Sequence, residues 1–204
     1  MSIGPWLNFE DQTMRFAAAL LSIVLLLSAC GKPGSNSSSS SSPGPAPAVA
    51  PDNPGGLDAS KDLSTELKKM MEAALGWSGS DDARLRALIK TLVLPNHEAW
   101  MKKTFGDDIG GERSKGYGEM LPKLEEAVMK FFATIKAENQ TEITVVHLAS
   151  PEDKEAKGAQ SEALRSMKQP VALYTVSFKA KGESLGKSLW SFVYVDGAFR
   201  LMGK

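Results

Sequence analysis

Between Asp62 and Ala137, apolar residues recur every three or four positions, which is the period of a helix with one buried face. Capping residues and the first periodic positions predict four helices, starting near Asp62, Asp81 (or Ser80), Asn96 and Met120. The glycine-rich segment from Gly106 to Gly118 is predicted to be a loop. Pro122 would then lie in the first turn of the last helix, where proline is tolerated.

From Thr141 onward the apolar period changes to two residues, which is the period of a strand with one buried face. The polar segment from Ser150 to Gln169 is predicted to be a long, mobile connection. Four strands are predicted, at Glu142–Ala149, Val171–Ala180, Lys187–Val195 and Ala198–Gly203.

Asp196-Gly197 is the clearest local signal, because a two-residue hairpin turn of this kind needs positive φ at both positions. The turn sets Tyr194 opposite Phe199 and Phe192 opposite Leu201. One sheet face is therefore predicted to carry Trp190, Phe192, Tyr194, Phe199 and Leu201, extended by Ala172, Tyr174, Val176 and Phe178 from the preceding strand.

Near the N-terminus, Phe16–Leu27 is continuously apolar. As a helix it would measure about 18 Å, which is too short for about 30 Å of hydrocarbon but suits the apolar core of a signal peptide. Leu27-Ser28-Ala29-Cys30 directly follows and resembles the lipobox of bacterial lipoproteins. We expect residues 1–29 to be a signal peptide. Met14 is the start that we favour, because Glu10 and Asp11 do not suit such a segment.

The lipobox resemblance implies that Cys30 is the lipidation site, that it carries palmitate-type acyl chains, and that membrane lipid is the first partner of the chain. It also implies a place in the bacterial envelope, on the periplasmic side of a membrane. Gly31 follows the cysteine where aspartate would favour inner-membrane retention, so we expect the outer membrane in a Gram-negative cell. The alternative is a buried core helix with an ordinary cysteine.

Residues 31–56 consist almost wholly of small and polar residues, including the serine run Ser37–Ser42. Such a segment has too little apolar surface to offset the entropy of ordering. Residues 30–57 are thus predicted to be a lipidated, disordered tether spanning about 28 Å, and residues 58–204 a single domain. Cys30 is the only cysteine, so a disulfide within the chain is excluded. The zero formal net charge argues against nucleic acid as a partner.

The fold class that these patterns predict is α+β, with N-terminal helices packed on a curved antiparallel sheet of about four strands. This order, ending in the hairpin of Phe192–Arg200, resembles the nuclear transport factor two-like superfamily, a cone-shaped, cystatin-like fold. The resemblance implies an aromatic sheet face that can line an apolar pocket. That superfamily also includes ketosteroid isomerase and polyketide cyclases.

Several motifs that suggest a cofactor or metal fail on spacing. Gly182–Ser188 has one residue too few for a phosphate-binding loop and precedes a strand where that motif needs a helix. His97-Glu98 lacks the second histidine of a zinc protease, since position 101 is Met. In Asp107–Glu112 the acids are adjacent, unlike those of a calcium-binding loop. The sequence therefore predicts neither a metal site nor a cofactor.

Four residues are candidates for a functional site. His147 shares the phase of Ile143 and Val145, so it is the one candidate base for a pocket, although a core or edge histidine is commoner. Candidate ligand-binding residues are the polar-tipped aromatics Tyr174, Trp190 and Tyr194. The favoured function is a non-enzymatic module that binds a small apolar ligand or another envelope protein. The alternative is a small isomerase-, cyclase- or hydratase-like enzyme that uses the pocket.

Overall fold

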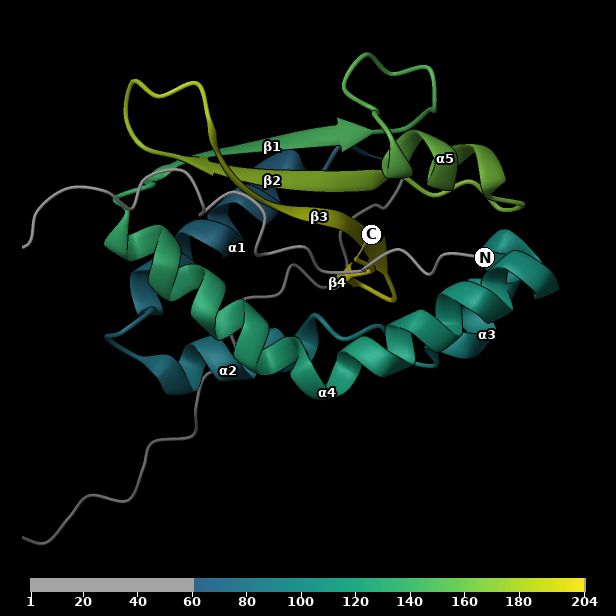
Figure 1. Ribbon diagram of the computed structural model, residues 1–204, viewed down its shortest axis with the longest axis horizontal. Helices are drawn as coiled ribbons and strands as arrows, with labels where there is room; N and C mark the ends of the chain where they lie inside the picture. The colour runs from purple at the N-terminus through teal and green to yellow at the C-terminus, as the bar shows by residue number, and fades with distance from the viewer. Residues whose placement is uncertain (1–60, 204) are drawn as a thin grey trace, which may run out of the picture. The chain divides into compact units, whose positions relative to one another are not determined.

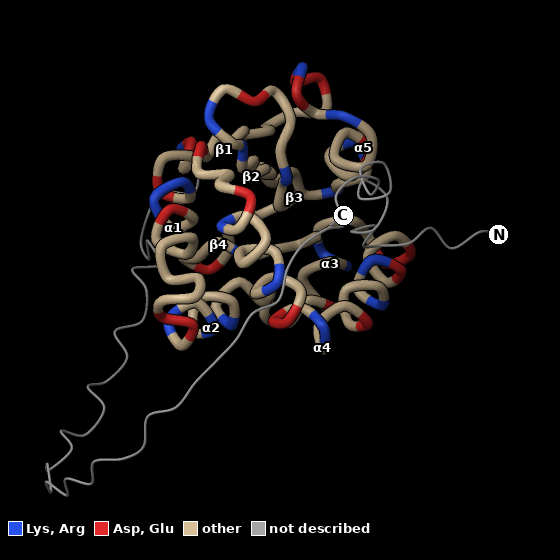
Figure 2. Tube along the Cα trace, turned by 60° about the vertical axis from the view of Figure 1, so that its left-hand side comes forward, with Lys and Arg blue, Asp and Glu red and all other residues tan. Residues whose placement is uncertain are grey.

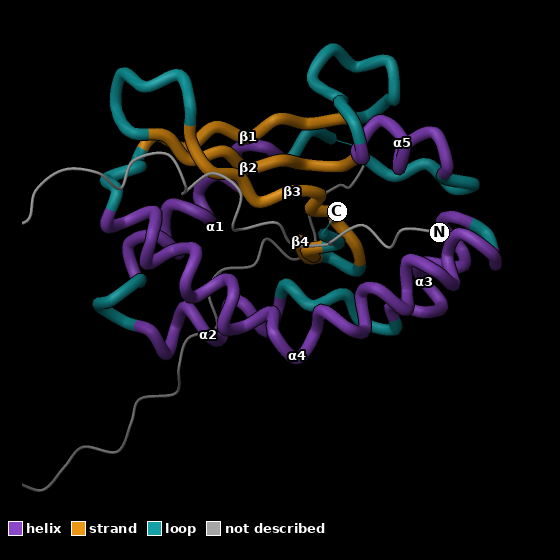
Figure 3. The backbone as a smooth tube through the Cα atoms, in the orientation of Figure 1, coloured by secondary structure: helices purple, strands orange, loops and turns teal. Residues whose placement is uncertain are grey.

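The computed structural model describes residues 61–203, and the predicted signal peptide, Cys30 and tether lie outside this range. The described part has an α+β fold in which four strands form one antiparallel sheet of order β1-β2-β3-β4 (Figures 1 and 3). The elements are α1 (Ser64–Trp77), α2 (Asp82–Thr91), α3 (His97–Phe105), α4 (Asp107–Ala137), β1 (Glu142–Leu148), α5 (Ala159–Ser166), β2 (Leu173–Lys179), β3 (Gly186–Val195) and β4 (Ala198–Leu201).

The prediction that all helices precede the strands is wrong, because α5 lies between β1 and β2. The same helix also corrects the prediction that Ser150–Gln169 is only a mobile connection. The segment folds because Ala163 and Leu164 in α5, and Met167 just after it, are buried together. This apolar stripe is short, and the charged residues around it concealed it in the sequence.

Helix α4 starts at Asp107, so the predicted loop Gly106–Gly118 is wrong and Pro122 lies inside the helix. Tertiary contact outweighs the low helix propensity of glycine here. A Cβ on Gly110 would lie 2.4 Å from the Met101 carbonyl oxygen, so only glycine lets α3 and α4 approach this closely. An internal proline removes a helix hydrogen bond and bends the axis, and Figure 1 shows α4 changing direction along its length.

The main core lies between one face of the sheet and helices α1, α2 and the C-terminal half of α4. Phe131 and Phe132 of α4 both meet Phe178 of β2 edge to face, with ring centroids 5.4 and 5.8 Å apart. This orientation suits the charge distribution of aromatic rings and adds to the free energy gained by burial. We call this cluster the first core.

The closing hairpin has the predicted register, with Tyr194 opposite Phe199 and Phe192 opposite Leu201. Its turn residues Asp196 and Gly197 have φ of 51° and 74°, as the predicted turn requires.

The predicted position of Trp190 on the same face is wrong. Tyr174 pairs with Phe192 and Val176 pairs with Leu189. These partners are two positions apart in β2 but three apart in β3, so β3 contains a bulge of one extra residue. Leu189 and Phe192 both belong to the first core. Trp190, between them, is half-buried and belongs to neither of the two core clusters.

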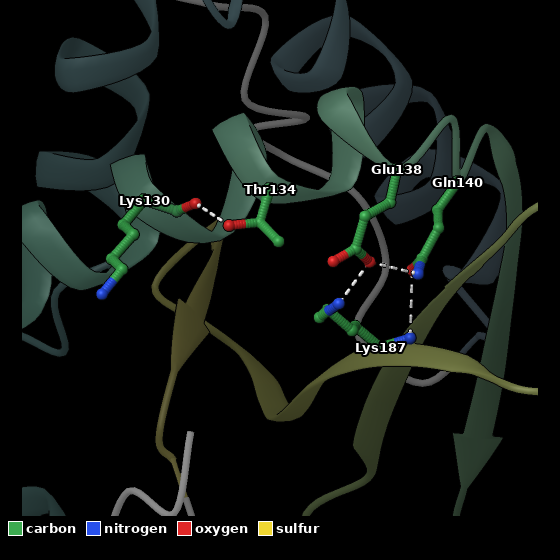
Figure 4. A network of polar contacts seen from close by, with 5 residues as sticks. All are labelled: Lys130, Thr134, Glu138, Gln140 and Lys187. Carbon is green, nitrogen blue, oxygen red and sulfur yellow. Dashed lines mark hydrogen bonds and ion pairs between the residues drawn. The ribbon is translucent and has the colours of Figure 1, made fainter. Parts of the chain in front are cut away.

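Two polar clamps fix the helices to the sheet. At the end of α4, Glu138 accepts hydrogen bonds from Lys187 Nζ and from Gln140 Nε2, while the Lys187 backbone N–H donates to Gln140 Oε1 over 3.2 Å (Figure 4). At the other edge, the Leu201 N–H donates to the Leu92 carbonyl over 2.8 Å, and Arg200 donates to the Thr91 carbonyl. The end of α2 is thereby joined to β4.

Replacing Phe192 with Ala should destabilise the fold severely, because this ring is fully buried in the first core. Truncating a buried Phe typically costs about 3–5 kcal/mol, a large part of the roughly 5–15 kcal/mol that holds a domain together. Denaturant midpoints would measure the loss. Exposed Lys90→Ala is the control and should change the free energy of unfolding by less than about 0.5 kcal/mol. Similar midpoints for both variants would contradict this account of the core.

Candidate functional site

A second apolar cluster lies apart from the first core, where β1 ends and β2 begins. We call it the second core. It joins residues from α3, α4, α5 and the sheet, and its buried members are Leu94, Met101, Phe105, Tyr117, Leu148, Ala163, Leu164, Met167, Leu173, Val193 and Met202. Three of these are methionines, and half-buried Met120 packs against them. Methionine is flexible and polarisable, so a cluster rich in it can repack around a guest molecule.

Short elements enclose the second core. The pair formed by α3 and the N-terminal half of α4 covers one side, and α5 covers another (Figure 1). The chain after α5 joins the two walls, because the Lys168 N–H donates to the Thr104 carbonyl over 2.6 Å. Beside this link the Lys168 side chain runs past Gly106. The walls are therefore connected by few hydrogen bonds, unlike the continuous strand pairing beside the first core.

Polar groups within the second core mostly have partners. The Tyr117 hydroxyl accepts a hydrogen bond from the Leu94 N–H over 2.8 Å, and burial raises the pKa of this phenol. Gln160 of α5 donates to the Thr175 hydroxyl, and the Ser161 hydroxyl donates to the Pro151 carbonyl. Such satisfied polar groups fix the position of an element that has little apolar area of its own.

Two guanidinium nitrogens are the exceptions, Nε of Arg113 in α4 and Nε of Arg200 in β4. Nη1 of Arg200 nevertheless donates to two backbone carbonyls, whereas the described part of the chain offers no such bond to Arg113. Its guanidinium lies 4.6 Å from the centroid of the Phe105 ring, a cation–π contact at the border of the second core. Its Nε atom is buried and has no hydrogen-bond partner, and no ion pair within residues 61–203 includes Arg113. Burial lowers the pKa of this group, and the charges of Glu162 and Glu112 only partly oppose that effect.

Two of the predicted site residues lie together at the start of α1. Tyr174 is 1 % exposed, and its hydroxyl accepts a hydrogen bond from the Leu63 N–H over 3.3 Å. Burial raises the pKa of the Tyr174 phenol. His147, its partner across β1 and β2, is half-buried and stacks on it with ring centroids 4.9 Å apart. Both side chains are thus part of the packing between sheet and helix.

Asp62 completes this group. Burial alone would raise its pKa, but hydrogen bonds from the hydroxyl and the N–H of Ser64, helped by the nearby His147, hold that pKa below its usual value. Asp62 was predicted to cap α1, and it does so from one residue before the N-cap position, which Leu63 occupies. The described contacts of this carboxylate therefore support the helix start.

Tyr194 is half-buried against the first core, whereas Trp190 lies outside both cores. Tyr174 and Tyr194 both meet the Phe199 ring, with centroids 5.6 and 5.1 Å from it. His97, the first residue of α3, lies 5.1 Å from the Tyr117 ring and lines a shallow, open depression with Asn96, Glu98, Ala99 and Lys102.

The motifs rejected on spacing lie in a turn between strands and at the start of a helix. Gly182–Gly186 turns from β2 to β3, and Asp107 and Asp108 form the first turn of α4. Within residues 61–203 no group of acids, histidines or cysteines could hold a metal ion. No helix in that range is long and apolar enough to cross a membrane. Acidic and basic residues are both present along α1, α2 and α4 (Figure 2).

Comparison with known proteins identified no relative of this chain. No family model, no curated protein and no solved structure matches the chain. Only the chain's own residues therefore bear on its function.

Sequence reasoning missed the second core and Arg113. The signal for the core was available in part, since Met101, Met167 and Met202 all follow helical or strand-like apolar patterns. What the sequence did not reveal was that three separate segments meet at one place. Arg113 was hidden because its segment was predicted to be a loop, where an arginine is ordinarily solvated.

Replacing Gly110 with Ala should loosen the wall formed by α3 and α4, because the new methyl group would collide with the Met101 backbone. Gly111→Ala is a matched control on the same helix, since its nearest contact would be the flexible end of Lys102 at 4.0 Å. The control should stabilise the protein by up to about 1 kcal/mol, the usual gain of Ala over Gly in a helix. Thermal unfolding of both variants tests this, and a gain for Gly110→Ala would disprove the close helix contact.

Proposed function

We propose that the protein is a lipid-anchored lipoprotein of the bacterial envelope whose domain binds an apolar molecule in the second core. The composition of that cluster is the main support for ligand binding. It combines buried methionines with aromatic rings, and at its border Arg113 has a buried Nε atom without a partner. Flexible apolar side chains with few polar groups at the border are the usual lining of small-molecule sites.

The first core suits a structural role instead. Phe178, which the resemblance to the cone-shaped superfamily would place near a pocket, meets Phe131 and Phe132 edge to face and so holds α4 on the sheet. A helical layer under an antiparallel sheet with a final hairpin supports membership of that superfamily. In this chain, we propose, ligand binding has moved to the other end of the sheet.

Anchoring is supported by the order of segments along the sequence. An apolar run that is too short to span a bilayer, a lipobox-like tetrapeptide and a Gly/Ser/Pro tract precede the first described helix. More than one acyl chain is needed for stable anchoring, which the lipoprotein modification of Cys30 would supply. The absence of aspartate after Cys30 favours the outer membrane of a Gram-negative cell. Envelope proteins or membrane lipids are then the partners within reach of the tether.

An enzymatic function of the same superfamily is the alternative, with His147 as its base. That chemistry places an ionisable group inside an apolar pocket, where burial adjusts its pKa. His147 instead stacks on a fully buried tyrosine beside the Asp62 carboxylate, at the edge strand β1. These contacts favour a packing role, so binding without catalysis is the function that we propose.

The anchor can be tested by mass spectrometry of the protein extracted from membranes. We expect a mature chain that begins at Cys30 and carries acyl chains on that residue. Cys30→Ser should accumulate as an uncleaved precursor, because it removes the atom that receives the lipid. Ser28→Thr, a conservative change in the same tetrapeptide, is the control and should still be processed. A native chain with a free Cys30 thiol would refute the anchor.

Ligand binding can be tested by native mass spectrometry of the detergent-extracted protein. We expect a bound apolar molecule whose mass adds to that of the acylated chain. Met167→Ala should reduce its occupancy several-fold, because Met167 lies in the second core. Met70→Ala is a matched control in the first core and should lower stability but leave occupancy unchanged. Equal occupancy in both variants would place the ligand elsewhere.

A further inference from the structure

The Nε–H of Arg113 is buried and has no hydrogen-bond acceptor among the described residues. Burying a polar nitrogen without a hydrogen bond is unfavourable, and such groups in native proteins call for an explanation. Arg200 Nε is also buried without a partner, but Nη1 of the same guanidinium donates to two backbone carbonyls, whereas the structure gives Arg113 no such bond. The face of the Phe105 ring attracts the positive charge of the guanidinium. The ring has no lone pair, however, so it cannot accept a hydrogen bond from the Nε–H in the way that an oxygen atom would. The Arg113 Nε–H therefore lacks an acceptor at the border of an apolar cluster.

The nearest carboxylates do not supply that acceptor. Glu162 of α5 and Glu112 of α4 act on Arg113 electrostatically, but both are exposed, and neither forms an ion pair with it. A second cation is close by, because Lys168 runs past Gly106, the residue next to Phe105.

We propose that Arg113 binds the carboxylate of a fatty-acid-like amphiphile whose alkyl chain occupies the second core. This inference rests on the proposed binding function and names its ligand class. A carboxylate can accept two parallel N–H bonds from a guanidinium, which provides the missing acceptor. The alkyl chain is the part that flexible methionines can surround. A neutral apolar molecule would use the methionines but leave the guanidinium without a partner.

The test uses the full mature protein in phospholipid nanodiscs and two fluorescent probes, 11-(dansylamino)undecanoate and its uncharged methyl ester. Trp100 reports on binding at this site, because its ring lies 6.3 Å from that of Phe105 and can transfer energy to a nearby dansyl group. Empty nanodiscs correct for partition of the probes into lipid. Trp100→Phe should reduce the transfer strongly, with Trp77 and Trp190 left as more distant donors, whereas Trp77→Phe, in a side chain packed on the first core, should leave most of it.

We expect wild-type protein to bind the carboxylate about tenfold or more tightly than the ester, as a charge-assisted hydrogen bond of ordinary strength implies. Arg113→Gln should remove this preference and leave ester affinity unchanged. Arg113→Lys should retain part of it, since it keeps the charge but loses the paired donors. Arg86→Gln, at an exposed arginine paired with Glu125 on another surface, is the matched control and should behave as wild type.

The possible failures are distinguishable. If neither probe binds to wild-type protein, the proposed binding function is wrong. If both bind equally well to wild type, the binding function stands and the role of Arg113 is wrong. If Arg113→Gln weakens both probes to the same extent, Arg113 supports the wall of the site and does not recognise the carboxylate.

Discussion

The edge-to-face contact of Phe131 and Phe132 with Phe178 is the interaction on which the other parts of the fold depend. It fixes the C-terminal half of α4 against β2, and the Glu138–Lys187 clamp continues the same attachment to β3. With that half fixed, the remainder of α4 extends beyond the first core and can pair with α3. The second core therefore exists because one long helix serves two clusters, one rigid and one rich in methionine.

The sequence predicted those elements whose signals are local. The Asp196-Gly197 turn and the register that it sets were correct, as was the capping role of Asp81, whose side chain accepts a hydrogen bond from the Arg84 N–H. Failures occurred where distant residues decide the outcome. Gly110 favours a loop by propensity, yet its missing side chain is what lets α4 lie against α3. The extra residue in β3 leaves no sign in the alternation of Trp190 and its neighbours.

The candidate site was less predictable than the fold for the same reason. Tyr174 was correctly placed on the aromatic sheet face, and the strand pairing puts His147 beside it. Whether a face lines a pocket or fills a core depends on what packs against it. Here α1 does so, and Tyr174 bonds to its first turn. The second core draws on segments more than 100 positions apart, such as Leu94 and Met202. Only their meeting in three dimensions gives Arg113 its unusual surroundings.

The hydrogen bond from Leu201 to Leu92 has a consequence for behaviour at high concentration. An exposed sheet edge can recruit strands from neighbouring molecules. The end of α2 already occupies part of the β4 edge, and Arg200 reinforces it through the Thr91 carbonyl. These contacts therefore oppose the addition of a foreign strand at β4.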